Sequence, residues 1–277
     1  MAVNAGNNPV VPHKLVAFAR DRYLTPTTAF GDPANLPYAP DPKYGQDITF
    51  GTGRAAPHGH DVGKTPMDLI PKMEALLVAF AAGDASGMAK RLFDQFTLKK
   101  SLVSFFEDAA LNRAAAKHQN IDHFCHAALS APTSLYNAGN KTRIHQALQA
   151  VKWDIEKLIA PTDLGVPAFN IGSKVYQSGD FNNGLGVMIN GVQYAYVYAT
   201  HYHWDGTRYG IRLKYLFYDV FGLDDDDLDE FGAESNSFWS SPAAVGITAW
   251  WQLQHQHGHA PLVTRIIINK DFESPAT

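Results

Sequence analysis

Six acidic side chains fall within the seven positions from Asp224 to Glu230, directly after a stretch rich in aromatic and aliphatic residues. Such a run can be a metal site, a group of catalytic carboxylates, or the polar first turn of a helix. An EF-hand loop that starts at Asp225 needs glycine at its sixth position and glutamate at its twelfth. The chain has Glu230 and Asn236 there, which excludes that loop. Acids that follow a turn at Gly222 suit helix capping and the helix dipole, so we expect a solvated helix start and keep a metal site as the alternative.

Histidines are the second group of residues with chemical potential, and the chain has 12 of them. His201 and His203 are two residues apart on one strand face, a spacing that can hold a divalent metal. On a helix, His255 and His257 would point about 200° apart, so they would not share one ion. No group has the H-E-x-x-H or C-x-x-C spacing of a strong metal motif. His201 and His203 are therefore the metal candidates, and hydrogen-bonded surface histidines are the alternative for each group.

The composition narrows the class of protein. The formal charge of −4 and the lack of a basic tract argue against nucleic acid as a partner. The single cysteine, Cys125, rules out an intramolecular disulfide. The first residues do not read as a secretory signal, and the longest apolar runs are far shorter than the roughly 18–20 residues that span a bilayer. We expect no transmembrane segment and a soluble protein made in the cytoplasm, which would leave the cell without a cleavable signal.

Hydrophobic periodicity divides the chain into three parts. Residues 1–66 are rich in proline, glycine and asparagine and predict an irregular arm. Residues 67–164 predict a helical part, in which one helix begins at Ser101 as its N-cap and another runs over 141–160. Residues 165–277 change to a period of two and predict a small antiparallel sheet. Helices followed by an antiparallel sheet predict an α+β fold, with the helical part and the sheet in one compact unit.

The third part has its own predicted order of elements. The stretch 181–191 reads as a short strand and turn. A helix is framed by Ser241 as N-cap, Pro242 at its first position and Gly258 past its end. The stretch 260–269 then closes the sheet, so the predicted sheet has a helix before its last strand.

Residues 193–219 predict a β-hairpin with a two-residue Asp-Gly turn. This turn pairs residues whose numbers sum to 411. One face then carries most of the aromatic residues and is buried, whereas the other carries His201 and His203 and is wetter. In this register the two histidines face away from Asp219. A bulge near Thr200 would remove that separation, and the pattern does not reveal one.

Three stretches carry a resemblance to a known family: NNGLGVMINGVQYAYVY, YDVFGLDDDDLD and ITAWWQLQHQHGHAPLVTRI. They resemble the bacterial family called domain of unknown function 3289, which has a similar Gly-Leu-Gly strand, a Tyr-Asp-x-Phe-Gly-Leu-Asp turn, and a Trp- and Leu-Gln-containing helix before a last strand. The likeness is specific over about 180–268, looser over the helical part and thin before residue 60. The positions that follow the family pattern are Tyr218, Asp219, Phe221, Gly222, Leu223, Asp224, Trp251, Leu253, Gln254 and His255.

The resemblance implies a biological context and no particular chemistry. Such domains are found beside, or fused to, spike components of type VI secretion systems in Gram-negative bacteria. The resemblance therefore implies an antibacterial effector that is delivered into the periplasm of a target cell. It also implies two kinds of partner, a cognate immunity protein and components of the secretion spike.

Our first hypothesis from the sequence is a toxin that hydrolyses peptidoglycan, its lipid-linked precursor or phospholipid in the cell envelope. Asp219 would be the general base or a metal ligand, because a carboxylate at the end of a buried face must be paired or functional. His255 would be its partner and Asp224 a supporting carboxylate. The substrate-binding candidates are Tyr218, Trp251 and Gln254.

The second hypothesis is a protein without enzymatic activity. It would be a membrane-perturbing toxin or an adaptor that loads cargo on the secretion spike, and Asp219 would then be structural. The substrate, the identity of any divalent metal cofactor and the oligomeric state stay open.

Overall fold

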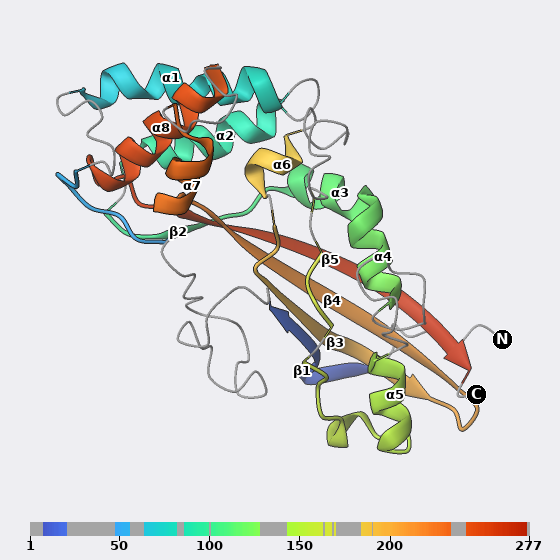
Figure 1. Ribbon diagram of the computed structural model, residues 1–277. Coiled ribbons are helices and arrows are strands. Elements are labelled where there is room, and N and C mark those ends of the chain that lie inside the picture. The colour runs from blue at the N-terminus through green and yellow to red at the C-terminus, as the bar shows by residue number, and fades with distance from the viewer. Residues whose placement is uncertain are drawn as a thin grey trace.

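The computed structural model describes residues 8–20, 48–55, 64–81, 86–99, 101–127, 143–162, 164–167, 169, 184–189, 191–233 and 242–275. Over these residues the chain has the predicted α+β fold (Figure 1). The described part contains one mixed sheet with the strand order β1 (Pro9–Arg20), β3 (Tyr194–Trp204), β4 (Arg208–Phe221), β5 (Leu262–Pro275) and β2 (Ser104–Phe106). Neighbouring strands are antiparallel except β2, which is parallel to β5.

The N-terminal part contributes more to the sheet than the composition predicts. An irregular arm over 1–66 does not hold for residues 9–20, which form β1 and pair with β3. Pro9 and Pro12 are compatible with this strand because β1 lies at the edge of the sheet, where a missing N–H leaves no ladder bond unmade. The proline content of this segment therefore led to the prediction of an irregular arm where the chain forms an edge strand.

The helix predicted from Ser101 begins later. Ser104–Phe106 form β2, a short parallel partner of β5. Helix α3 then begins at Ala109, with Asp108 as its N-cap. The Asp108 side chain accepts hydrogen bonds of 2.7 and 3.1 Å from two backbone N–H groups of the first turn. A carboxylate so placed satisfies groups that a helix end leaves unpaired, and it fixes where α3 starts.

The other helical predictions hold in part. The described helices are α1 (Pro66–Phe80), α2 (Ser86–Thr97), α3 (Ala109–Lys117), α4 (Gln119–Ala127), α5 (Arg143–Ala150), the 3-10 turn Ile155–Lys157, α6 (Leu185–Met188), α7 (Asp225–Phe231) and α8 (Pro242–His255). The helix predicted over 141–160 ends at Ala150, because Lys152 and Trp153 have φ angles of 54° and 65° and leave the helical conformation. The strand predicted within 181–191 is wrong, since α6 lies there. Ser241 is outside the described residues.

The β3–β4 hairpin has a different register from the predicted one. Near the turn, paired residue numbers sum to 413, because the Asp205 side chain accepts hydrogen bonds from the backbone of Thr207 and Arg208 and the turn is wider. A bulge between Ala199 and His201 lowers the sum to 412 along the rest of the pair. An odd change reverses which side chains share a face. Tyr194, Tyr196 and Tyr198 therefore share a face with even-numbered residues of β4, whereas Tyr202, on the turn side of the bulge, pairs with odd-numbered Ile211.

Each face of the sheet has its own apolar cluster. Odd-numbered residues of β4, such as Phe217, belong to the main core, in which helices cover the sheet. The second cluster, on the other face, contains Phe18, Tyr196 and Tyr218. Because successive strand residues point to opposite faces, Tyr218 and Asp219 cannot line the same site on one face. Helices α1, α2, α7 and α8 gather at the end of the sheet where β4 ends and β5 begins (Figure 1).

Candidate functional site

The acidic run forms the start of helix α7, as expected. Asp224 is the N-cap, and its side chain accepts a hydrogen bond of 3.0 Å from the backbone N–H of Asp227. The Asp227 side chain in turn accepts one of 3.1 Å from the backbone N–H of Asp224. These reciprocal bonds make a capping box, which accounts for two of the acids by local helix chemistry.

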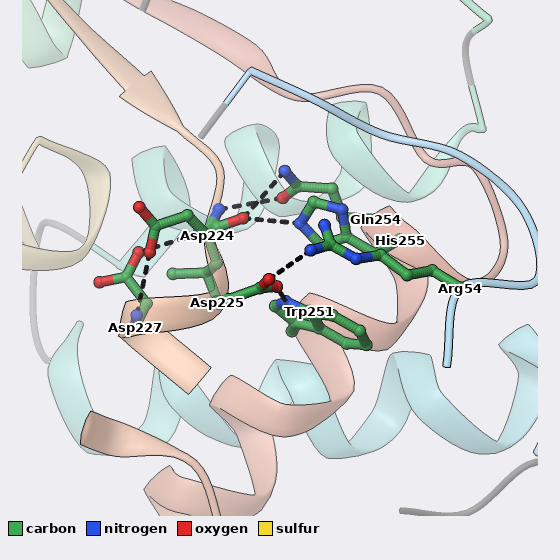
Figure 2. Close-up of polar contacts among 8 residues, drawn as sticks. Arg54, Asp224, Asp225, Asp227, Trp251, Gln254 and His255 are labelled. Atoms are coloured by element: carbon green, nitrogen blue, oxygen red, sulfur yellow. Dashed lines mark hydrogen bonds and ion pairs between the residues drawn. The ribbon is translucent and has the colours of Figure 1, made fainter. Parts of the chain in front are cut away.

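The turn before α7 is held by two side chains from the end of α8 (Figure 2). The Gln254 side chain accepts a hydrogen bond of 3.0 Å from the backbone N–H of Leu223 and donates one of 3.1 Å to its carbonyl oxygen. The Nε2 of His255 lies 2.8 Å from that same oxygen. A carbonyl only accepts, so Nε2 carries the proton and the neutral ring keeps a lone pair on Nδ1. The backbone of Leu223 thus connects the acidic turn to the end of α8 through hydrogen bonds.

A segment from the N-terminal part closes the cluster. The backbone of residues 51–54 donates hydrogen bonds to carbonyl oxygens at the end of α8, of which the shortest, from Gly53 to Gln256, is 3.0 Å. Arg54 forms an ion pair with Asp225, and its guanidinium lies 5.7 Å from the centre of the Trp251 ring. The Trp251 Nε1 donates a hydrogen bond of 3.1 Å to the same aspartate. The segment therefore satisfies helix-end carbonyls and brings a cation to the acidic turn.

Two groups of the cluster have shifted pKa values, the carboxyl of Asp227 and the imidazole of His255. Burial raises the pKa of the Asp227 carboxyl from 3.8 to about 6, and the neighbouring carboxylates of Asp224, Glu230 and Asp226 push it the same way. Burial also lowers the pKa of His255. The nearby Arg54 adds to that lowering, whereas the hydrogen bond to Leu223 opposes it. His255 is therefore neutral at pH 7.

The structure brings together four of the six residues predicted for catalysis and substrate binding. Asp224, Trp251, Gln254 and His255 all lie in the cluster of Figure 2. Three of them are almost completely buried, with exposed fractions of 0% for Trp251, 0% for Gln254 and 2% for His255. Their polar atoms bond to protein groups, and these contacts account for the positions of their side chains.

The other two predicted residues lie elsewhere. Asp219 is on β4 opposite Thr264 of β5 and is 6% exposed, on the helix-covered face of the sheet. Tyr218 is on the opposite face, where its ring contacts Tyr196 and Phe105. His255 bonds to the Leu223 backbone, so the predicted Asp219–His255 pair is not among its described hydrogen bonds.

The metal candidates have ordinary polar neighbours. The Nδ1 of His201 lies 3.2 Å from the Thr200 hydroxyl, and the Nδ1 of His203 lies 3.3 Å from the Asn8 side chain. Among the described residues, no three His, Cys, Asp or Glu side chains are grouped closely enough to hold a metal ion. The bulge beside Thr200 exists, but His201 and His203 pair with Arg212 and Gly210 of β4 and so still face away from Asp219.

Three residues of this cluster were not singled out from the sequence: Arg54, Asp225 and Asp227. Asp225 and Asp227 were visible only as members of the acidic run. Arg54 lies 171 positions before its partner Asp225, in a segment whose composition predicts no regular element. No local pattern could have linked it to the turn.

Comparison of the chain with family models, with curated proteins and with solved structures finds no match. The resemblance to domain of unknown function 3289 therefore stays a prediction. Separately, no helix among the described residues is both long and apolar enough to cross a membrane.

Proposed function

We propose that this chain is an antibacterial effector of a type VI secretion system and that it acts on the envelope of a target bacterium. In this proposal the chain reaches the periplasm of the target cell through the secretion spike. A cognate immunity protein protects the producing cell. The starting point is the family resemblance of the three sequence stretches quoted above.

One structural observation supports the proposal. The turn motif at 218–229 and the helix motif at 247–266 meet at Leu223, whose backbone is bonded by Gln254 and His255. Residues of two separate stretches thus serve a single structural joint. The two stretches therefore form one structural unit in the folded chain, which supports considering them together.

The geometry favours action by binding over hydrolysis at the residues predicted for catalysis. A general base must reach its substrate, yet His255 is 2% exposed and Asp219 is 6% exposed. Asp224 is more exposed than these two residues, but its carboxylate accepts a hydrogen bond from Asp227 in the capping box. These contacts support positioning roles for all three side chains, and hence the non-enzymatic alternative, a membrane-perturbing toxin or a spike adaptor.

An envelope hydrolase is the second candidate, and one observation favours it. The half-buried Asp227 carboxyl has a pKa raised to about 6, which is in the range that suits a general acid near neutral pH. Asp227→Asn separates the two candidates, because asparagine can still accept the hydrogen bond from Asp224. A hydrolase that uses Asp227 loses killing in this variant, whereas a binding toxin keeps it.

The proposal as a whole is tested by expressing the chain in Escherichia coli, once in the cytoplasm and once directed to the periplasm. We expect loss of viability only from the periplasm. Depolarisation of the inner membrane before any lysis would support the membrane-perturbing mode, whereas release of cell-wall or lipid fragments first would support the hydrolase. If neither compartment shows killing, the toxin proposal fails and a spike adaptor becomes the leading function.

A further inference from the structure

Strand β5 has a neighbouring strand along its whole length on one side and along only part of it on the other. All 14 of its residues pair with β4. On the other side, β2 pairs with β5 only over Leu262–Thr264, at the end of β5 that is far from the β3–β4 turn (Figure 1). Among the described residues, the outer side of β5 beyond Thr264 is therefore an edge of the sheet.

The backbone groups that point outward on this edge follow from one hydrogen bond. The N–H of Ile267 donates a bond of 3.1 Å to the Asn112 side chain of α3, so it points away from β4. Because backbone groups alternate in direction along a strand, the N–H and carbonyl groups of Asn269, Asp271 and Glu273 also point outward. Among the described residues these three N–H groups have no hydrogen-bond partner. This last part of the edge thus presents an unfilled row of strand donors and acceptors.

Acidic side chains accompany this row on one face of the sheet. Asp271 forms an ion pair with Arg212 of β4, which lies opposite it. Glu273 lies opposite Gly210, so β4 places no side chain directly beside its exposed carboxylate. A strand added on the outer side would bring its own side chains beside both acids, and basic residues are favoured there.

The other face of the same edge is apolar and charge-balanced. Phe272 is half-buried against the main core, with its ring centre 6.0 Å from that of His126. Lys270 forms an ion pair with Asp122 of α4. An apolar side chain of an added strand would cover the remaining exposed part of Phe272. The edge therefore fits a strand in which basic and apolar residues alternate.

A second copy of this chain fits the edge poorly. If two β5 strands paired antiparallel about Asp271, the Asp271 carboxylates of the two copies would lie beside each other. Like charges directly opposite destabilise a strand pair, and charged residues on an edge hinder self-pairing. The charges thus favour a different, basic partner.

We propose that the outer edge of β5 over 269–275 binds an extended segment of another protein as an added strand. Basic residues of that segment lie beside Asp271 and Glu273, and apolar residues lie beside Phe272. In strand addition, backbone hydrogen bonds give affinity and the alternate side chains give specificity. This inference goes beyond the proposed function and does not depend on it, because binding at this edge is measured without killing.

The test is fluorescence anisotropy of short labelled peptides titrated with the purified full-length chain. The first peptide is Thr-Lys-Val-Lys-Val-Lys-Thr, and the second has glutamate in place of each lysine. Two further lysine peptides carry backbone N-methyl groups, one on the lysines and one on the valines. Since backbone groups alternate, only one of these two sets faces β5 in an added strand.

Four variants of the chain accompany the peptides. Asn269→Pro removes an outward N–H without removing a bond to β4, and Asn269→Ala is its control because it keeps that N–H. Glu273→Gln removes the exposed charge beside the row. Its matched control is Glu156→Gln, which makes the same change at an exposed residue outside the sheet.

We expect the wild type to bind the lysine peptide about tenfold more tightly than the glutamate peptide. One N-methylated peptide should lose binding and the other should keep it. Asn269→Pro should bind the lysine peptide about two- to tenfold more weakly than Asn269→Ala, because one backbone hydrogen bond is lost. Glu273→Gln should weaken binding about two- to fivefold, whereas Glu156→Gln should leave it unchanged.

The inference is overturned if the lysine peptide does not bind saturably, if the glutamate peptide binds as tightly, or if both N-methylated peptides bind equally. It is also overturned if Asn269→Pro melts with the wild type and binds as tightly as Asn269→Ala. If Asn269→Pro does not fold, the N-methylated peptides decide the question with the wild type alone. A wild-type dimer that Glu273→Gln strengthens, seen by analytical ultracentrifugation, would assign the edge to a second copy and contradict the proposal.

Discussion

At the scale of residues, Gln254 is the side chain on which most of the cluster depends. It is fully buried, and besides Leu223 it donates a hydrogen bond of 2.8 Å to the carbonyl oxygen of Thr49. One amide thus joins three segments of the chain: the N-terminal segment, the acidic turn and α8. A buried polar group costs free energy when its partners are removed, so this residue should be sensitive to substitution.

Replacing Gln254 with leucine should lower the free energy of unfolding by about 2–4 kcal/mol, because the buried Leu223 N–H and carbonyl lose a partner and the part-buried Thr49 carbonyl loses one as well. The melting temperature should fall by roughly 5–12 °C in a chain of this size. Thermal unfolding followed by circular dichroism measures this. The control is Gln256→Leu, since half-buried Gln256 joins its neighbours through its backbone. Equal melting temperatures for both variants would contradict the claim that the Gln254 side chain stabilises the fold by joining these three segments.

Asp227 predicts a pH dependence of stability. Its pKa is raised to about 6 in the folded chain from an ordinary 3.8. Between these values the unfolded chain ionises first, so stability falls as pH rises from about 4 to about 6, and the penalty is complete above that window. Asp227→Asn should therefore be more stable than the wild type by about 1–3 kcal/mol at pH 7.5 and nearly equal at pH 4.

Urea denaturation at a series of pH values checks this prediction for Asp227. A difference between variant and wild type that stays constant from pH 4 to pH 7.5 would contradict it. Such a result would mean that the carboxyl is hydrated in the folded chain, and it would also weaken the hydrolase candidate.

At the scale of elements, the contact between α1 and α8 is unusually close at Gly246. A Cβ atom there would lie 2.7 Å from Cγ of Leu76 and 3.2 Å from the carbonyl oxygen of Lys72. Those distances are too short, so Gly246→Ala should destabilise the fold by about 1–3 kcal/mol through overpacking. Gly87→Ala in α2 is the matched control, because its added Cβ would meet only an Arg91 side-chain atom at 3.8 Å.

The control should gain about 0.5–1 kcal/mol, the usual effect of replacing a helical glycine with alanine. Chemical denaturation of both variants measures the change in the free energy of unfolding, which should be a loss for Gly246→Ala and a gain for Gly87→Ala. If Gly246→Ala is as stable as Gly87→Ala, the two helices are not packed as closely as described.

Elements with a strong period could be predicted from the sequence, whereas elements defined by their partners could not. Helix α8 begins at Pro242, as its end signals predict, and strand β5 begins within the predicted stretch but runs six residues further, to Pro275. β2 is three residues long and exists because β5 lies beside it. The bulge after Ala199 shifts the register of β3 by tertiary pairing, which no spacing within the hairpin encodes.

The candidate site divides in the same way. Its members Asp224, Gln254 and His255 could be named from the sequence because they lie in recognisable motifs. Their joint partner, the Leu223 backbone, could not be predicted, since main-chain groups leave no signature in side-chain chemistry. Arg54 was equally hidden, because its contact spans most of the chain.

At the scale of the whole molecule, one face of the sheet carries the helical layer and the main core, and α1 forms an outer surface of that layer. The acidic turn, the end of α8 and the segment 48–55 lock together at the end of the sheet. This arrangement joins three separate stretches of the chain at one end of the sheet. The buried residues that were predicted for catalysis and substrate binding, such as His255 and Gln254, thus make hydrogen bonds that stabilise this end of the fold.

The proposed function has the chain act by binding, with His255 and Asp224 only positioning the fold. Its most direct test is periplasmic killing of Escherichia coli by His255→Gln and Asp224→Asn, beside the wild type and with melting temperatures of all three chains. Glutamine can still donate to the Leu223 carbonyl, and asparagine is an effective N-cap. We predict that each variant melts within a few degrees of the wild type and kills as efficiently. A variant that keeps its melting temperature and loses killing would contradict the claim and assign that residue to a reaction.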